Sequence, residues 1–562
     1  MRRRTLLAGA AALACTQALP PASPTPRTRV ERILASLSLE EKVGQLLTIA
    51  FHGTRVTPHA ERLLAERRAG GVILFKENYD DAASLRRLVD DLSRIAERGA
   101  AQPLFFPIDQ EGGSVVRVAK GAAVLPGQMA LAATPDPEGS VRRAAEITAR
   151  ELRSFGANWQ LAPVADVNTE PRNPIIGNRA YGSDPRQAGR LVAAAVRAYD
   201  AAGILSCVKH FPGHGATTED SHTGLPLLAS DRGRLDRVEL VPFKAAIDAG
   251  VPAVMTAHIE LPAIDPTPGR PASLSPAVIG GLLRRDLGFT GLCVTDDLEM
   301  DALGRSGGQA RAALAAVSAG ADHALLRFDE SAHTEAHRLL VDAARTGALP
   351  AARLDEAVRR VLAAKERGGI LDRRQAPAAD VAADRAAALE LGRAAVTLLR
   401  NDGVLPLRGT VFVYSEHPAD LTRIEEQSPR LWELIAEAYP RTILPHRIRG
   451  EMLRPDPASA VAMAREADAV VIATADAHID EAHAALIRAL AAARPTVLIA
   501  QRGPYDILVA PNVNAYLCTY DGREPTARAA VDILLGRRKP QGRLPAEIPG
   551  LFGIGAGMSD LR

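Results

Sequence analysis

The residues with the clearest capacity for chemistry lie close together between positions 209 and 222. The segment reads Lys209-His-Phe-Pro-Gly-His-Gly215 and is followed by Asp220-Ser-His222. Asp220 and His222 are two positions apart, so on an extended loop both side chains project to the same side. The carboxylate can then fix the tautomer of the imidazole and leave its other ring nitrogen for proton transfer. This spacing predicts that His222 is a general acid and base partnered by Asp220.

A second carboxylate lies far from this segment in the sequence. Asp296 directly follows the apolar run Leu292–Thr295, where a buried strand is expected to end. An acid/base group and a separate carboxylate nucleophile are the minimum apparatus of a retaining glycosidase. The two sets of residues therefore predict glycoside chemistry if the fold brings them to one cavity.

A metal site is the main alternative for the first segment, because His210, His214, Asp220 and His222 lie within thirteen residues. A His-x-x-x-His pair suits zinc when a helix places both rings on one face. Here Phe-Pro-Gly at positions 211–213 interrupts any helix, so a catalytic metal is disfavoured. The chain also has no glycine-rich phosphate-binding or dinucleotide-binding fingerprint after a strand. We therefore expect neither a metal nor a cofactor.

The elements that must position these residues repeat along the chain. From residue 43, apolar runs recur about 40 residues apart with amphipathic helical stretches between them, which is the spacing of β-α units. This pattern predicts an α/β fold with a (β/α)8 barrel over residues 29–370. The runs are Val43–Phe51, Gly71–Phe75, Pro103–Ile108, Trp159–Val164, Leu205–Val208, Ala253–Ala257, Leu292–Thr295 and Ala324–Phe328.

Polar residues follow most of these runs, and active sites of such barrels lie at the carboxyl ends of the strands. We therefore expect carboxylates, imidazoles and a scarce lysine to meet on one face of the barrel. The groups are Asp109-Gln-Glu111, Asp166-Val-Asn168, the segment 209–222, His258 with Glu260, and Asp296-Asp297.

The remaining sequence divides into a linker and a second domain. The polar stretch 371–385 is predicted to be the linker, and residues 386–562 a smaller α/β sandwich domain. The strands expected there are Val411–Tyr414, Ala469–Ala473, Thr496–Ala500 and Ala515–Thr519, separated by helical patterns.

The N-terminus predicts export. Residues 1–15 combine a basic start, an apolar run and small residues, as in a signal peptide. Cys15 resembles the cysteine that accepts the lipid in bacterial lipoproteins. In that case the protein would contact a membrane only through its lipid anchor. Residues 16–28 are proline-rich and predict a tether. We expect a periplasmic or cell-envelope protein; a disordered N-terminal tail is the alternative.

Composition narrows the class of protein. The 562 residues are 47% hydrophobic and 24% charged, with a net charge of +2, which excludes a disordered chain and a polytopic membrane protein. The charges are spread evenly rather than gathered into a basic stripe, so no nucleic-acid partner is expected. The oligomeric state is left open.

The motifs resemble those of a known family. The segment 209–222, with Gly224-Leu-Pro226, is similar to the signature of glycoside hydrolase family 3, in its β-N-acetylglucosaminidase branch. Asn173–Asp184, Ile108–Gly113 and Val294–Leu298 resemble further motifs of that family. Leu398–Leu407 and Gly542–Pro545 resemble the second domain of its longer members.

The resemblance implies a role for each matching residue. Asp296 is expected to be the nucleophile, His222 the acid/base and Asp220 its partner. Two departures concern the shape of the pocket: Ser114 stands where arginine is usual, and Ala216 where aspartate is common. The residues expected to bind the sugar are Asp109, Arg117, Arg179, Lys209 and His210.

These roles imply a retaining exo-β-N-acetylglucosaminidase (a β-N-acetylhexosaminidase) acting on glycans. Because Asp220 favours a cationic acid/base, an anionic substrate is tolerated, and peptidoglycan-derived muropeptides are the expected natural substrate. The alternatives are a β-glucosidase or β-xylosidase, a phosphorylase of the same family, and a glycan-binding lipoprotein without activity.

Overall fold

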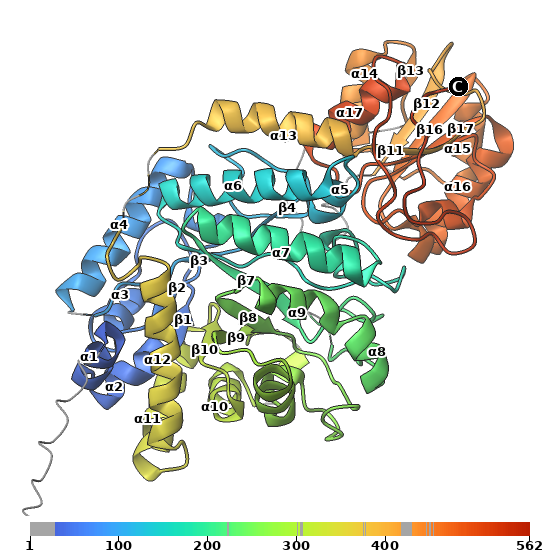
Figure 1. Cartoon of the computed structure of the whole chain (residues 1–562). Helices are drawn as coiled ribbons and strands as arrows, with labels where there is room; N and C mark the ends of the chain where they lie inside the picture. Colours follow the sequence, from blue (N-terminus) through green and yellow to red (C-terminus); the bar gives the residue numbers. More distant parts are fainter. Residues whose placement is uncertain are drawn as a thin grey trace, which may run out of the picture.

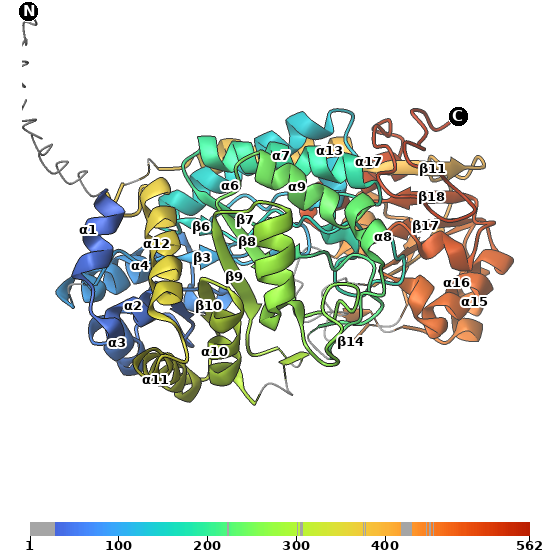
Figure 2. The same cartoon turned by 60° about the horizontal axis from the view of Figure 1, so that its bottom comes forward.

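The protein, seen here as a computed structural model, consists of a barrel followed by a smaller sandwich domain (Figures 1 and 2). The structure describes residues 28–99, 101–221, 224–300, 302–303, 307–374, 376, 378–416, 430–445, 447–448, 451–452 and 454–562. The predicted signal segment 1–15, with Cys15, and all of the predicted tether except Thr28 lie outside these residues.

Within the described residues, eight parallel strands form the barrel in sequence order. β1 pairs with both β2 and β10, and bridges Gly71↔Phe105 and Leu74↔Ile108 join the β2 and β3 segments, which closes the ring. The (β/α)8 prediction is therefore confirmed, and every predicted run contains a strand. The strands are β1 (Leu47–Ile49), β2 (Gly71–Val72), β3 (Pro107–Ile108), β6 (Trp159–Gln160), β7 (Leu205–Phe211), β8 (Ala253–Thr256), β9 (Leu292–Asp297) and β10 (His323–Leu326).

Helices surround the barrel, and local signals fix their ends. In α6, Asp136 accepts a hydrogen bond from the Gly139 N–H, Pro137 begins the helix, and Gly156 ends it in a left-handed conformation. The helices before the second domain are α1 (Arg29–Ser36), α2 (Leu39–Gln45), α3 (Pro58–Ala65), α4 (Ala82–Arg98), α5 (Gln128–Ala132), α6 (Pro137–Phe155), α7 (Pro185–Ala201), α8 (Arg232–Arg237), α9 (Leu240–Asp248), α10 (Gln309–Ala319), α11 (Glu330–Thr346) and α12 (Ala351–Arg367). Shorter or irregular turns are η1 (Lys76–Asn78), η2 (Gly177–Arg179), η3 (Ala272–Leu274) and the π-helix η4 (Ala277–Asp286).

A two-stranded hairpin leaves the barrel directly after β3. It consists of β4 (Gln110–Gly112) and β5 (Val115–Val116), which pair antiparallel. Gly112 and Gly113 both have positive φ, and a Cβ atom on Gly113 would lie 2.5 Å from the Cα of Gly127. The turn therefore requires glycine for conformation and for close approach.

The second domain is built on a six-stranded sheet with order β11-β18-β17-β16-β12-β13. α15 and α16 pack against one face and α14 and α17 against the other, because successive strand residues alternate between two cores. Its elements are β11 (Thr397–Asn401), β12 (Val411–Ser415), α14 (Leu431–Ala438), β13 (Thr442–Ile443), β14 (Arg447–Ile448), β15 (Glu451–Met452), α15 (Pro457–Ala464), β16 (Ala469–Thr474), η7 (Ala477–Ile479), α16 (Glu481–Ala493), β17 (Thr496–Ala500), η8 (Asp506–Val509), β18 (Ala515–Cys518) and α17 (Glu524–Leu534).

Helix α13 (Val381–Ala395) joins the two parts and runs beside α6 towards the second domain (Figure 1). Asp380 caps it, so the helix begins inside the predicted linker 371–385. Ala387, Ala388 and Leu391 pack into the core on the barrel side. The predicted domain boundary at 386 thus falls within a helix that contacts both parts.

Two further observations concern the chain as a whole. Cys207, Cys293 and Cys518 are free and buried. Among the described helices, none combines the length and apolar character needed to span a bilayer.

Candidate active site

A cavity of about 480 Å³ opens at the carboxyl ends of the barrel strands. Its walls come from the residues after β2, β3 and β6, from the second half of β7, and from the ends of β9 and β10. The predicted site residues that line it are Asp109, Arg117, Arg179, Lys209, His210 and Asp296.

One wall of the cavity is a network of two carboxylates and two cations. Lys209 Nζ lies 2.6 Å from Asp109 Oδ1 and 2.7 Å from Glu111 Oε1. Arg179 donates two hydrogen bonds to Glu111, Nε to Oε2 at 2.9 Å and Nη2 to Oε1 at 2.8 Å. Such a bidentate pair fixes direction as well as charge.

The electrostatics of this wall keep Glu111, Arg179 and Lys209 charged. Burial raises the pKa of Glu111, but the charges of Arg179 and Lys209 outweigh it and hold that pKa well below its usual range. The side chain of Lys209 is 3% exposed, and burial lowers its pKa. Asp109 and Glu111 more than compensate, so the pKa of Lys209 is raised. The wall therefore presents fixed donors and acceptors suited to sugar hydroxyls.

Arg117 lies at the edge of this wall. Its Nη2 is 3.9 Å from Asp109 Oδ2, and its guanidinium lies 5.7 Å from the centre of the Phe75 ring. Arg327 lies 5.2 Å from the same ring and 5.1 Å from that of Phe328. The mouth of the cavity thus combines aromatic faces with cationic side chains.

Two imidazoles lie at the carboxyl end of β7, His210 within the strand and His214 in the loop that follows it. His210 Nδ1 lies 2.7 Å from Asp166 Oδ2, and its Nε2 lies 3.3 Å from Arg179 Nη2. His214 donates its backbone N–H to Asp166 at 2.6 Å. Burial lowers the pKa of His214 to about 4, so its ring is neutral at physiological pH. Asp166 therefore anchors both histidines through one buried carboxylate.

Asp296 is the next-to-last residue of β9 and lines the cavity. Burial by itself raises its pKa, but the His210 and His258 rings outweigh that effect and hold it below its usual value. Its Oδ1 accepts the backbone N–H of Asp297 at 2.8 Å. Burial raises the pKa of Asp297 to about 6, and that carboxylate faces Arg327 at 3.2 Å. Asp296 is therefore the anionic carboxylate suited to nucleophilic attack.

The predicted proton-transfer pair is described only in part. His222 lies outside the described residues. Asp220 is half-buried, and its carbonyl accepts the Gly224 N–H at 3.1 Å. Its neighbour Ser221 lines the cavity, with Oγ 3.1 Å from His214 Nε2. The loop that carries Asp220 thus borders the cavity, and the roles of Asp220 and His222 stay predictions.

Three site residues were expected on this face of the barrel but were given no role of their own. Glu111 forms ion pairs with both Lys209 and Arg179, and Asp166 contacts both histidines. His258 lowers the pKa of Asp296, and its Nε2 lies 2.9 Å from the Asp297 carbonyl. Each one belongs to a polar group that follows an apolar run. Glu111 also lies two positions after Asp109, and this spacing is the sequence signal that could have assigned it to the same wall of the cavity.

The two departures from the expected motif have different surroundings. Ser114 is buried, and its Oγ accepts a hydrogen bond from Asn178 Nδ2 at 2.8 Å. Ala216 is partly buried and packs against the barrel core. Ser114 therefore takes part in the structure around the cavity, whereas Ala216 contributes packing.

Comparison with known proteins identifies the family. A family model described as the glycosyl hydrolase family 3 N-terminal domain matches residues 38–364. A second, described as the C-terminal domain of the same family, matches residues 396–553. The chain belongs to glycoside hydrolase family 3. The first match covers the barrel and the second covers the sandwich domain.

Several family 3 relatives carry hexosaminidase names. Beta-hexosaminidase A of Pseudoalteromonas piscicida is 36% identical over 378 residues, 63% of this chain and 63% of that protein. The match thus spans less than two thirds of that relative. A beta-hexosaminidase of Stenotrophomonas maltophilia is 36% identical over 313 residues, 54% of this chain and 91% of the relative.

Two solved structures superimpose on more than 90% of this chain. A β-N-acetylglucosaminidase from Paenibacillus sp. superimposes with a TM-score of 0.83 at 36% identity, covering 91% of this chain and 99% of that one. A beta-glucoside phosphorylase superimposes with a TM-score of 0.76 at 25% identity, covering 92% and 96%. The two-domain arrangement is therefore shared with both.

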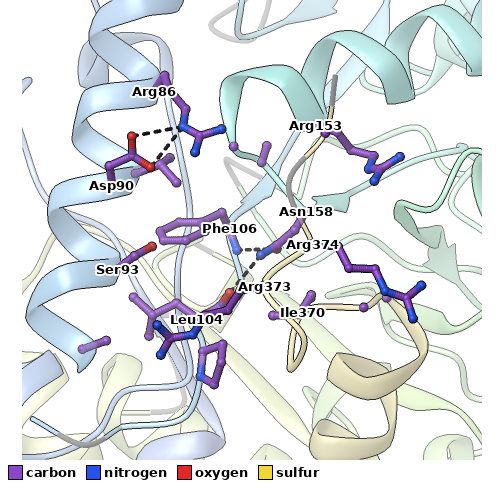
Figure 3. Close-up of a pocket in the computed structure, with 18 of the residues that line it drawn as sticks. Arg86, Asp90, Ser93, Leu104, Phe106, Arg153, Asn158, Ile370, Arg373 and Arg374 are labelled. Atoms are coloured by element: carbon purple, nitrogen blue, oxygen red, sulfur yellow. Dashed lines mark hydrogen bonds and ion pairs between the residues drawn. The ribbon is translucent and has the colours of Figure 1, made fainter. Parts of the chain in front are cut away.

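A second cavity of this family 3 chain lies at the opposite end of the barrel and has a volume of about 280 Å³ (Figure 3). Leu104, Phe106 and Asn158, which precede β3 and β6, line it. Two of its arginines have acidic partners: Arg86 donates to Asp90, as Figure 3 shows, and Arg373 pairs with Glu97. Barrel chemistry belongs to the carboxyl ends of the strands, so this cavity is not the candidate active site.

Over the part of the chain that the structure describes, no group of three or more His, Cys, Asp or Glu side chains is arranged to hold an ion. His210 and His214 instead share Asp166.

Proposed function

We propose that the protein is a retaining exo-β-N-acetylglucosaminidase. The observation that carries the proposal is the anionic Asp296 beside the wall of Asp109, Glu111, Lys209 and Arg179 in one cavity. Such a wall suits the hydroxyls of a single terminal sugar, while Asp296 faces the same space. The hexosaminidase names of two curated relatives and the β-N-acetylglucosaminidase name of the Paenibacillus structure support N-acetylglucosamine as that sugar.

The proposed reaction has two steps. Asp296 attacks the anomeric carbon while His222, held by Asp220, protonates the departing glycosidic oxygen. The same imidazole then removes a proton from water, which displaces Asp296 and releases the sugar with net retention. The lowered pKa of Asp296 supports its role, because the nucleophile must be ionised at the working pH.

Muropeptides derived from peptidoglycan are the proposed natural substrates. Their N-acetylmuramic acid residue carries a lactyl carboxylate next to the bond to be cleaved. The cations Lys76, Arg117 and Arg327 line the cavity and suit such an anionic leaving group.

Phosphorolysis is a second candidate, because one structural relative is named a phosphorylase and the same cations could receive phosphate. Adding phosphate separates the two reactions: sugar 1-phosphate is the product of phosphorolysis, and free N-acetylglucosamine is the product of hydrolysis. Product analysis on a muropeptide digest applies the same distinction to the proposed substrate.

The proposal is tested with aryl glycosides. The N-acetylglucosaminide should be cleaved much faster than the glucoside, with the β-anomer of the free sugar as the first product by NMR. Asp296→Asn should lower kcat below about one thousandth while the circular dichroism spectrum stays unchanged. Asp90→Asn, at the opposite cavity, is the control and should retain activity. A glucoside preference, or normal turnover by Asp296→Asn, would contradict the proposal.

A further inference from the structure

The loop after β18 of the second domain reaches the wall of the barrel cavity. Arg523 in this loop donates from Nε to the Gly113 carbonyl and from Nη2 to the Ser114 carbonyl, the latter at 3.4 Å. Gly113 and Ser114 form the tip of the β4–β5 hairpin. Arg523 is 3% exposed, so these contacts are shielded from water. The hairpin tip is therefore held by a side chain from the other domain.

Asp521 makes a second connection from the same loop. Its Oδ2 accepts the Gly127 N–H at 2.8 Å, and its Oδ1 accepts the Arg523 N–H at 3.1 Å. Thr526 also donates to Asp521 Oδ1. Gly127 lies directly against Gly113, since a Cβ atom on Gly113 would lie 2.5 Å from the Gly127 Cα. Asp521 thus orients Arg523 and holds the strip of barrel under the hairpin tip.

The loop also reaches the segment that carries Arg179. Asn178 donates its Nδ2 protons to the Tyr520 carbonyl and to Ser114 Oγ, both at 2.8 Å. Tyr520 has a left-handed backbone with φ of 63°, which turns its carbonyl towards Asn178. The second domain therefore contacts the residue next to Arg179 as well as the hairpin that carries Glu111.

The barrel by itself holds the base of the hairpin more firmly than its tip. At the base, Gln110 accepts the N–H groups of Arg117 and Val118 and donates to the Val118 carbonyl. At the tip, the barrel contributes the Leu125 carbonyl, which accepts the Gly113 N–H at 3.0 Å, while Arg523 supplies donors for the Gly113 and Ser114 carbonyls. A buried carbonyl that loses its donor is destabilised, because nothing replaces the lost hydrogen bond, and a short hairpin then shifts to relieve this loss.

We propose that Arg523 is a positioning residue through which the second domain aligns the Glu111–Arg179 pair of the active site. Arg523 and Asp521 fix the hairpin, Tyr520 fixes Asn178, and the bidentate ion pair joins the two segments across the cavity wall. The second domain is in this sense a structural part of the sugar-binding site. The proposal deepens the proposed function and depends on it only for the choice of substrate.

The test compares Arg523→Ala and Arg523→Lys with Arg528→Ala. Arg528 is an exposed residue of α17 that pairs with Glu524 in the same helix. Hydrogen–deuterium exchange of the full chain should rise in residues 110–117 and 176–180 for Arg523→Ala, with the strands β7–β9 still protected. Arg528→Ala should leave the exchange pattern unchanged.

Kinetics separate positioning from loss of folded protein. For Arg523→Ala, KM for the aryl N-acetylglucosaminide and Ki for N-acetylglucosamine should rise about tenfold, since the sugar wall is displaced. Partial unfolding would instead lower kcat at constant KM. Arg523→Lys keeps a donor and should recover part of the loss, whereas Arg528→Ala should match the wild type.

Two results would overturn the proposal: unchanged exchange in residues 110–117 and 176–180, or a fall in kcat with KM and Ki unaltered. A wild-type protein that cleaves no N-acetylglucosaminide contradicts the proposed function instead. The exchange measurement still decides the positioning role in that case, because it needs no turnover.

Discussion

At the residue scale, the cavity depends on one carboxylate shared by two buried cations. Glu111 receives Lys209 on one oxygen and Arg179 on both. Asp109 gives Lys209 a second partner, so the loss of Glu111 would affect Arg179 more strongly. Removing one member of a buried charge network leaves its partner charged in a medium that cannot solvate it.

We predict that Glu111→Gln lowers the free energy of unfolding by about 3 kcal/mol at pH 7. The pKa of Glu111 is held below its ordinary value, so its contribution is full above pH 4.5 and is lost as the pH falls further. The deficit of the variant should therefore shrink in acid. Urea titrations at pH 7 and pH 4 measure it.

Glu61→Gln is the matched control for this prediction. Glu61 pairs with Arg98 on the surface, where an ion pair contributes roughly 0–1 kcal/mol. A Glu111→Gln deficit no larger than that of the control, or one that grows in acid, would contradict the role of Glu111.

The site residues also differ in how well the sequence alone predicts them. Asp109, Lys209, His210 and Asp296 could be placed because each directly follows or ends an apolar run. The partners of Glu111 and Asp166 depend on contacts between segments tens of residues apart, which no local pattern encodes. The contact of Arg523 with Gly113 joins two domains, and neither segment signals it.

At the element scale, α12 places a lysine inside the barrel. Lys365 donates to Gln45 Oε1 at 2.7 Å and to the Gly70 carbonyl at 3.1 Å, and lies 4.8 Å from the centre of the Phe105 ring. Burial lowers its pKa from 10.5 to about 7. The barrel thus accommodates an amine through neutral oxygens and a ring face rather than through a carboxylate.

We predict that stability rises with pH between about 7 and 10 because of Lys365. In this window the unfolded chain binds a proton that the folded chain has released, so alkalinity favours folding. Lys365→Met lacks this pH-dependent contribution to the free energy of unfolding. The unfolding free energy of the wild type minus that of the variant should grow by up to about 1.4 kcal/mol per pH unit.

Chemical denaturation at pH 7, 8 and 9 measures the difference. Lys539→Met removes an exposed lysine that pairs with Asp560 and serves as the control, with no comparable trend. A pH-independent difference for Lys365→Met would show that the amine stays protonated in the folded barrel.

At the scale of the whole molecule, the two domains share buried contacts in several places. Asn168 of the barrel donates to the Tyr505 hydroxyl at 3.2 Å, and His478 Nε2 lies 2.8 Å from the Pro171 carbonyl. Gly182 has positive φ, and a Cβ atom there would lie 2.1 Å from the Pro545 carbonyl. These contacts indicate that barrel and sandwich unfold as one unit.

The two tryptophans of the chain allow a direct check, since Trp159 lies in the barrel and Trp432 in the second domain. We predict that Trp432→Phe and Trp159→Phe variants, each with one fluorophore left, show parallel urea transitions once their own stability changes are measured by circular dichroism. Within each variant, the fluorescence and circular dichroism midpoints should coincide. A fluorescence midpoint that departs from the circular dichroism midpoint would show independent domains.

The closed ring of strands also has a consequence for synthesis of the chain. Leu47 pairs with Ala324, so the first strand has no neighbour on one side until the eighth strand has left the ribosome. Until then β1 exposes an unpaired edge, which is a site for association with other chains. The loop with Arg523 emerges later still. A nascent chain of this length therefore completes its catalytic face only near the end of translation.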